Sequence, residues 1–180
     1  MPAAFRLPLD VFYEREARHP RQRFLVQPVG GGQVETLTWE DVGHQARCAA
    51  HWLRARELPQ GSHIALISKN CAHWIIADLA IWMAGHVSVT VCPDADRRGV
   101  AYALGHSEAR LVFVGRPFEN AAHWRDTEAA VPQDIPVIRL PQAEPGRGEA
   151  WYAIVAATPR LRTVTLPDPG ALATILYVPG

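Results

Sequence analysis

Residues 61–93, GSHIALISKNCAHWIIADLAIWMAGHVSVTVCP, contain two short apolar runs on either side of a longer one. The run from His63 to Ser68 favours a strand, and the β-branched residues 86–91 favour a second strand. Between them we predict a helix that is capped by Asn70 and ends before Gly85. The order strand, helix, strand predicts a parallel βαβ unit.

The helix between these two strands is apolar on nearly every side, with Asp78 almost its only polar residue. A helix of this kind is buried on most sides, because no face is polar enough to favour water. We therefore expect this helix to contribute four large side chains to the core: Trp74, Ile75, Leu79 and Trp82.

Towards the carboxyl end, the alternation of strands and helices continues. The pattern predicts a helix over 94–105, strands over 109–115, 135–140 and 171–178, and a weaker helix over 149–157. Seven prolines between Phe118 and Pro169 favour irregular structure in that stretch.

Towards the amino end, residues 23–38 predict a β-hairpin that reverses at Gly30–Gly32, and residues 39–56 predict an amphipathic helix. Thr38, followed by Asp41, forms its capping signal. The whole pattern predicts an α/β fold of βαβ units, with a parallel sheet covered by helices on both faces and preceded by a short β-hairpin.

The composition argues against some classes of protein and of binding partner. The chain has 180 residues, of which 48% are hydrophobic, and its 18 basic residues balance 18 acidic ones. This balance, without a basic run, argues against nucleic acid as a partner, and no apolar run is long enough for a transmembrane segment. The start carries no secretory signal, so we expect a cytoplasmic protein with reduced cysteines.

Side chains with catalytic potential are scattered along the chain. The eight histidines show no metal-ligand spacing, so we expect no metal site. Cys71 lies near a helix start, where a thiol pKa can fall, but an inert buried thiol is the simpler interpretation. No serine lies in a nucleophile elbow, and Ser68 is explained as a turn residue. We assign no catalytic residue.

The last seven residues, TILYVPG, predict a buried strand, Thr174–Val178, that ends in a Pro179–Gly180 turn. A strand that enters a glycine-containing loop and then a helix is a common phosphate site, because loop and helix N–H groups point at the anion. The end of the chain is therefore the candidate approach to a nucleotide.

Two segments, residues 61–93 and YALGHSEARLVFVG (102–115), resemble the adenylate-forming (AMP-binding) enzymes, and are most like their bacterial long-chain fatty-acid CoA ligases. The resemblance extends to residues 14–26, 36–42 and 168–180 and is weak over 118–167. It implies that residues 1–180 form an incomplete, amino-terminal AMP-binding domain that ends at the entry to the phosphate-binding loop.

In that family the terminal strand leads into a loop of the form Thr-Ser-Gly-Thr-Thr-Gly-x-Pro-Lys-Gly, which holds the ATP phosphates. By resemblance, Tyr177 precedes this loop and Gly180 is its first glycine, whereas Val178 and Pro179 replace the Thr and Ser. The resemblance thus implies Tyr177 and Gly180 as cofactor-binding positions. The rest of the loop and the catalytic Lys of the family have no counterpart in residues 1–180.

The resemblance implies a fatty acid, ATP, Mg²⁺ and CoA as the substrates and cofactors of the complete ligase, none of which we expect this chain to bind strongly. The acyl-AMP formed from ATP would pass its acyl group to CoA. An alternative is a non-catalytic module that docks with a separate ligase chain or self-associates, and a third is a gene fragment without a function.

Overall fold

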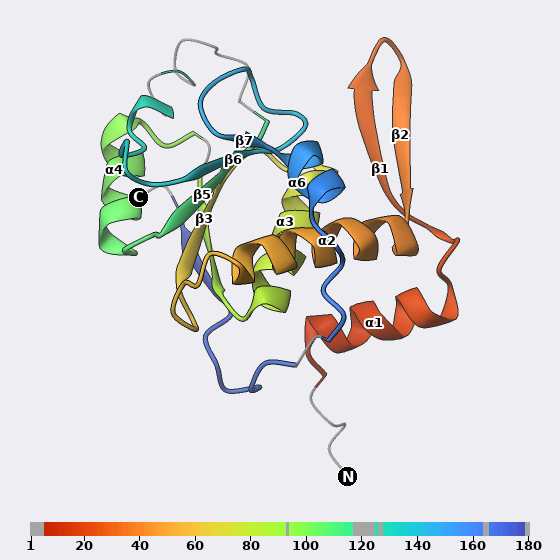
Figure 1. Cartoon of the computed structure of the whole chain (residues 1–180). Helices are drawn as coiled ribbons and strands as arrows, with labels where there is room; N and C mark the ends of the chain where they lie inside the picture. The colour runs from red at the N-terminus through yellow and green to blue at the C-terminus, as the bar shows by residue number, and fades with distance from the viewer. Residues whose placement is uncertain (1–5, 93, 117–124, 126–127, 164–165, 179–180) are drawn as a thin grey trace.

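The computed structural model describes residues 6–92, 94–116, 125, 128–163 and 166–178. Its helices and strands alternate over most of the chain (Figure 1). In chain order they are α1 (Pro8–Arg18), β1 (Arg23–Gly30), β2 (Gln33–Thr38), α2 (Trp39–Arg54), β3 (His63–Ile67), α3 (Ala72–Ala84), β4 (Val87–Val91), α4 (Arg97–His106), β5 (Leu111–Val114), β6 (Val137–Arg139), β7 (Glu149–Ala150), α6 (Trp151–Ala157) and β8 (Thr174–Tyr177).

Six strands form one sheet in the order β7-β6-β5-β3-β4-β8, and every adjacent pair is parallel. The antiparallel β1–β2 hairpin stands apart from this sheet (Figure 1). The predicted α/β class, with βαβ units after a hairpin, is confirmed. The prediction of strands over 109–115, 135–140 and 171–178 is also confirmed, as β5, β6 and β8. The prediction that the last of these is buried is wrong: β8 lies at the margin of the sheet, where Thr174 and Leu176 are exposed.

Each face of the sheet has its own apolar core, because side chains alternate along a strand. On β3, Ile64 and Leu66 pack with α1, α2, α3 and α6 on one face. Ala65 and Ile67 pack with α4 on the other. Helices therefore cover both faces, as predicted, and α4 lies across the sheet from α2 and α3 (Figure 1).

The hairpin and α2 are built by the local signals that predicted them. Gly30, Gly31 and Gly32 have φ values of 94°, 58° and 76°, which other residues rarely adopt. At the start of α2, the Asp41 N–H donates to Thr38 Oγ1 at 3.2 Å, and the Thr38 N–H donates to Asp41 Oδ2 at 2.9 Å. This reciprocal pair is a capping box.

Helix α3 is buried over ten of its 13 residues, but two details differ from the prediction. Leu79 is in the core, whereas Ile75 is 36% exposed and Trp74 and Trp82 are only partly buried. Asn70 does not cap the helix, because Cys71 is its N-cap residue and the Gln27 side chain accepts from the Ala72 N–H at 2.8 Å.

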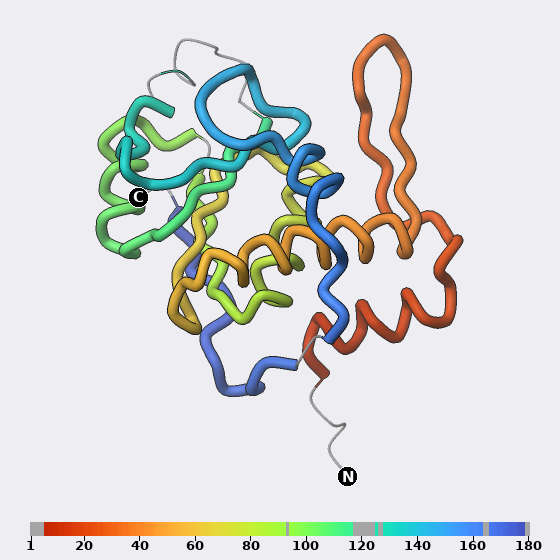
Figure 2. The backbone as a smooth tube through the Cα atoms, viewed as in Figure 1, coloured from red at the N-terminus to blue at the C-terminus, as the bar shows by residue number. Residues whose placement is uncertain are grey.

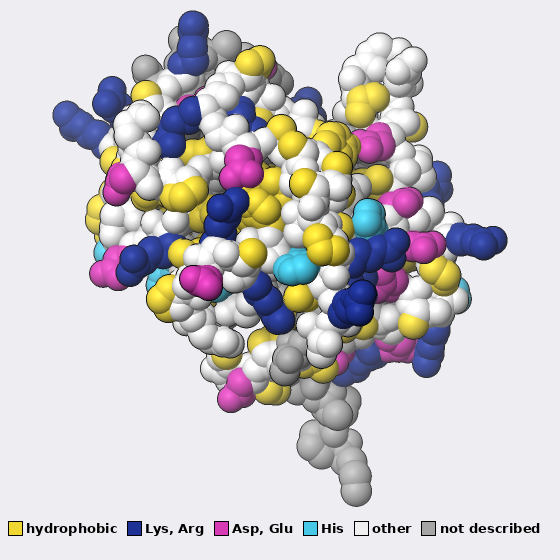
Figure 3. Space-filling view, viewed as in Figure 1, with side chains coloured by type: hydrophobic (Ala, Val, Ile, Leu, Met, Phe, Trp, Pro, Cys, Tyr) yellow, Lys and Arg dark blue, Asp and Glu magenta, His cyan; other side chains and the backbone are white. Residues whose placement is uncertain are grey.

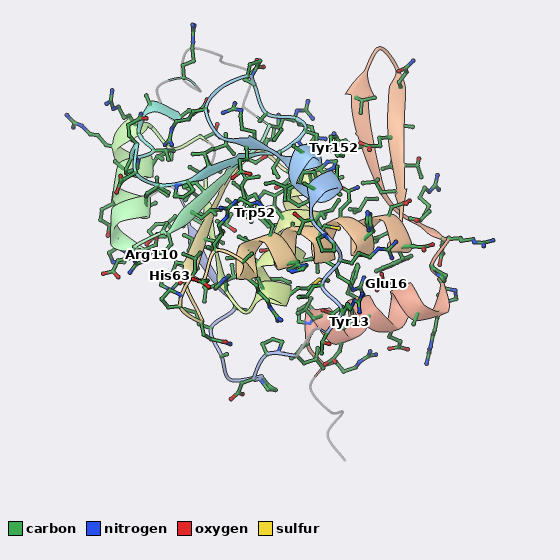
Figure 4. The ribbon with its side chains drawn as sticks, in the orientation of Figure 1. Tyr13, Glu16, Trp52, His63, Arg110 and Tyr152 are labelled. Atoms are coloured by element: carbon green, nitrogen blue, oxygen red, sulfur yellow. The ribbon has the colours of Figure 1, made fainter. Side chains whose placement is uncertain are left out.

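Helix α1 is an addition that the sequence analysis did not predict. Its Leu9 and Phe12 are buried, and its Glu16 carboxylate accepts from Arg47 Nη1 of α2 at 2.6 Å. A Cβ at Gly43 would lie 1.9 Å from that carboxylate, so glycine leaves room for the Glu16–Arg47 ion pair over this part of α2. Figure 4 shows Tyr13 and Glu16 between α1 and α2.

The surface carries no single dominant charge on the face drawn in Figure 3, where Lys and Arg are interspersed with Asp and Glu. This mixture matches the equal numbers of basic and acidic residues in the sequence. Among the described residues, no helix combines the length and apolar character that a membrane span requires.

Candidate functional site

The carboxyl ends of the parallel strands form the first candidate site. In open α/β sheets, ligands bind where successive connections leave the strands towards opposite faces. The connection after β3 leads to α3 on one face, and the connection after β4 leads to α4 on the other. The edge formed by the ends of β3, β4 and β8 is therefore the candidate functional site, called the carboxyl edge below.

At the end of β3, the Ser68 hydroxyl makes two hydrogen bonds to the backbone. It donates to the Lys69 carbonyl at 2.7 Å and accepts from the Arg116 N–H at 2.8 Å. A Cβ at Gly115 would lie 2.3 Å from this oxygen, so the turn after β5 needs a glycine to approach it. Ser68 therefore joins two turns of the edge, and its role as a turn residue is confirmed.

The start of α3 also lies at the carboxyl edge. Because the Gln27 side chain accepts from the Ala72 N–H, a neutral amide oxygen occupies part of the positive end of this helix. The Cys71 thiol is buried and lies 3.8 Å from the Ser68 hydroxyl. These contacts favour the structural interpretation of Cys71 over a reactive thiol.

Tyr177 lies at the carboxyl end of β8, opposite Val91 of β4. Its hydroxyl lies 2.6 Å from Nδ1 of His106, and its ring meets those of His106 and Tyr102 edge to face. Burial raises the pKa of the Tyr177 phenol, so the phenol is neutral near pH 7. Gly180, the other predicted cofactor-binding position, lies outside the described residues.

The sequence analysis did not identify the partners of Tyr177. Tyr102 and His106 are one helical turn apart, and their rings stack with centroids 5.3 Å apart. The four-residue spacing of Tyr102 and His106 in the sequence indicates that both lie on one face of α4. It does not indicate which strand lies against that face. The three rings form an aromatic cluster beside the carboxyl edge.

Two further histidines make contacts that the sequence analysis missed. His73 is fully buried, with Nδ1 at 3.1 Å from the Gln142 amide and Nε2 at 3.4 Å from the Tyr152 hydroxyl. Burial lowers the pKa of His73 to about 4, so its ring is neutral. His44 lies one turn before Cys48, 3.8 Å away, a pair that the sequence analysis overlooked. Within the described ranges, no three His, Cys, Asp or Glu side chains are grouped to hold a metal ion.

Comparison with known proteins decides the family of this α/β fold. Residues 12–180 match the family model described as "AMP-binding enzyme". The chain belongs to the AMP-binding enzyme family. The sequence resemblance to adenylate-forming enzymes is thereby confirmed at the level of the family.

Similar AMP-binding proteins differ in the activities that their names give. One of them is a subunit of the linear gramicidin synthase of Brevibacillus parabrevis, 32% identical over 117 residues, which is 65% of this chain and 2% of that protein. Acetate–CoA ligase CCL3 of Humulus lupulus is 33% identical over 85 residues, which is 47% of this chain and 15% of that ligase. A gramicidin synthase and a CoA ligase are thus both among the relatives.

The fold of this chain matches solved CoA ligases. It superimposes on the anthranilate CoA ligase AuaEII, solved in complex with anthranoyl-AMP, with a TM-score of 0.79 at 14% identity. The match covers 96% of this chain and 32% of that structure. The chain thus spans about a third of a solved relative and a smaller share of the curated ones.

Proposed function

We propose that residues 1–180 are the amino-terminal part of the AMP-binding domain of an ATP-dependent acid–CoA ligase, and that its acid is a long-chain fatty acid. The family match over residues 12–180 supports an adenylate-forming enzyme, and the likeness to an acetate–CoA ligase supports the ligase class. The fatty-acid assignment rests on the sequence likeness of residues 61–93 and 102–115 to bacterial long-chain ligases.

One observation carries the proposal: β8 delivers the chain to the carboxyl edge beside β4. In the family, the loop after this strand holds the ATP phosphates, and we assign the start of that loop to the residues that follow Tyr177. The bond between Tyr177 and His106 fixes the end of β8 against α4. We therefore assign Tyr177 a positioning role at the approach to the nucleotide.

The proposed reaction has two steps. A carboxylate oxygen of the fatty acid attacks the α-phosphorus of ATP, which breaks the α–β phosphoanhydride bond and gives acyl-AMP and pyrophosphate. The CoA thiolate then attacks the acyl carbon and displaces AMP. Donors of the phosphate loop stabilise the charge on the departing pyrophosphate, and Mg²⁺ neutralises phosphate charge when it is bound. We assign these donors to the part of the ligase that follows Gly180.

Fatty-acid-dependent exchange of labelled pyrophosphate into ATP tests the proposal. Residues 1–180 alone should give no exchange, because the loop donors and the catalytic Lys follow Gly180 in the family. A protein extended through the coding sequence downstream of Gly180 should give exchange with palmitate and much less with acetate or benzoate. Exchange by residues 1–180 alone, or a preference for benzoate, would contradict the proposal.

A second candidate function is a non-catalytic module that docks with a separate ligase chain. The observation that favours it is the position of β8 at the margin of the sheet, with Leu176 64% exposed. An unpaired strand margin can accept a strand from another chain. An intact gene for the remaining ligase, separate from this one, would favour docking, whereas a continuous reading frame would favour the single-chain ligase.

A further inference from the structure

A cavity of about 1000 Å³ lies at the amino ends of β3, β4 and β8, at the opposite end of these strands from the carboxyl edge. Its walls come from the start of α1, the ends of α2 and α3, and residues 166–173. The last of these segments crosses below the sheet before it enters β8 (Figure 2). The cavity is within the size range of small-molecule sites.

Two side chains in the cavity wall, those of Arg54 and His86, carry nitrogen atoms without a hydrogen-bond partner among the described residues. Arg54 has five guanidinium N–H groups, and one nitrogen, Nη2, donates to the Met83 carbonyl at 2.9 Å. None of the ion pairs among the described residues includes Arg54. His86 is 6% exposed, and neither of its ring nitrogens has a partner among the described residues.

Two acceptors in the cavity wall already have partners. At the end of α3, the carbonyl of Trp82 accepts from the Gly85 N–H at 3.0 Å. The acid in the wall, Asp168, accepts from the Gly170 N–H at 2.8 Å. The exposed Arg54 therefore supplies a positive charge without an ion pair among the described residues, and the buried His86 supplies an unpartnered N–H, so a ligand with acceptor oxygens would bond to both.

The rest of the wall is largely apolar. Leu58, Trp82 and Leu172 line the cavity, and Leu172 is 58% exposed. The Trp82 indole N–H is already bonded to the Ala173 carbonyl at 3.0 Å, so its ring offers apolar surface. His63 enters the wall from the start of β3, at the lower end of the sheet in Figure 4.

We infer that this cavity binds an apolar monocarboxylate, with its carboxylate on the Arg54 guanidinium and its hydrocarbon body along Leu58, Trp82 and Leu172. Burial, together with the nearby Arg54, lowers the pKa of His86, so the ring is neutral and offers one N–H donor and one acceptor nitrogen. Because the cavity lies at the amino ends of the strands, this site is separate from the carboxyl edge and does not depend on the proposed ligase reaction.

Calorimetric titration of the 180-residue chain with dodecanoate, below its micelle concentration and without ATP, tests the site. We expect one dodecanoate per chain and an affinity at least about tenfold lower for Arg54→Gln, because a charge-assisted hydrogen bond contributes more than about 1.4 kcal/mol. Dodecanol, which lacks the charge, should bind wild type and Arg54→Gln equally. The matched control is Arg98→Gln, an exposed arginine on α4 whose loss should leave dodecanoate binding unchanged.

A second variant separates cavity binding from adsorption to the surface. Ala171 is exposed and lines the cavity, so Ala171→Trp should fill space without removing a core contact and should abolish dodecanoate binding. Circular dichroism would verify that both variants are folded. The inference is overturned by no dodecanoate binding to wild type, by equal affinity of wild type and Arg54→Gln, or by binding that survives Ala171→Trp.

Discussion

The phenol oxygen of Tyr177 lies 2.6 Å from Nδ1 of His106, a residue 71 positions earlier in the chain. This hydrogen bond ties β8, at the margin of the sheet, to the end of α4. Since the two residues are far apart in sequence, their hydrogen bond is a tertiary contact between two elements of the α/β fold.

A double-mutant cycle should detect this coupling. Tyr177→Phe, His106→Ala and the double variant should give a coupling energy of roughly 1 kcal/mol in the free energy of unfolding, the usual net value of one hydrogen bond. Urea unfolding provides the measurement. Tyr102→Phe, which keeps the stacked ring, is the control and should change stability by less than about 0.5 kcal/mol. Additive effects of the two substitutions would show that the hydrogen bond contributes nothing.

Two adjacent isoleucines of α3 should differ sharply in their contribution to stability. Ile76 is fully buried in the core on one face of the sheet, whereas Ile75 is 36% exposed. Ile76→Ala should lower the free energy of unfolding by about 2 to 5 kcal/mol, because it leaves a cavity in the core. Ile75→Ala should cost much less, since its side chain already contacts water. Equal midpoints in urea for the two variants would mean that α3 is rotated from the orientation described.

The same helix shows where sequence-based prediction reaches its limit. Its position and burial could be predicted, because an apolar segment between two β-branched strands has few other arrangements. Its outward face could not, because Trp74 and Ile75 are as apolar as Ile76 and the pattern contains no polar stripe. The cap could not be predicted either, since its partner, Gln27, comes from β1 and meets α3 only in the folded chain.

The candidate site was predictable to a similar extent. Tyr177 could be placed at a strand end from the β-branched and apolar residues before it, and the structure confirms this strand as β8. Its contact with His106 could not be predicted, because strand order is a long-range property. Helix α1 was missed although Pro8 at its start and the spacing of Leu9 and Phe12 are local helix signals.

Asp78 should make the chain less stable as the pH rises. Its side chain is 8% exposed, Oδ1 has no partner among the described residues, and burial raises its pKa from 3.8 to about 6. The folded state therefore holds the proton more tightly than the unfolded state. The cost of ionising Asp78 is absent below the unfolded pKa, grows between about pH 4 and pH 6, and is fully present above pH 6, where it reaches roughly 3 kcal/mol.

Asp78→Asn should therefore stabilise the chain at about pH 7.5 and much less at about pH 4. Urea unfolding at both pH values measures the difference between variant and wild type, and exposed Asp134→Asn is the matched control. The comparison with wild type is needed because His73 acts in the opposite direction: its pKa is lowered to about 4, so its contribution is lost as the pH falls below about 6.5. A stabilisation by Asp78→Asn that is independent of pH would contradict the assignment.

The margin of the sheet at β8 leads to a prediction about association. Leu176 is 64% exposed, whereas Ile175 is partly buried and packs with the core under α4. Because Leu176 lies on the strand margin, we predict that the 180-residue chain self-associates at high concentration through this strand. Because Leu176 is exposed and Ile175 is partly buried, substitutions at these two positions distinguish a loss of strand pairing from a loss of the fold.

Leu176→Lys should reduce association and leave the fold intact, because a charge on an exposed margin discourages pairing with another strand. Ile175→Lys should instead unfold or strongly destabilise the chain, because it places a charge in the core under α4. Light scattering measures association, and circular dichroism measures folding, for wild type and both variants. A wild-type chain that stays monomeric at high concentration, or a folded Leu176→Lys variant that associates as strongly as wild type, would show that β8 is not the surface responsible.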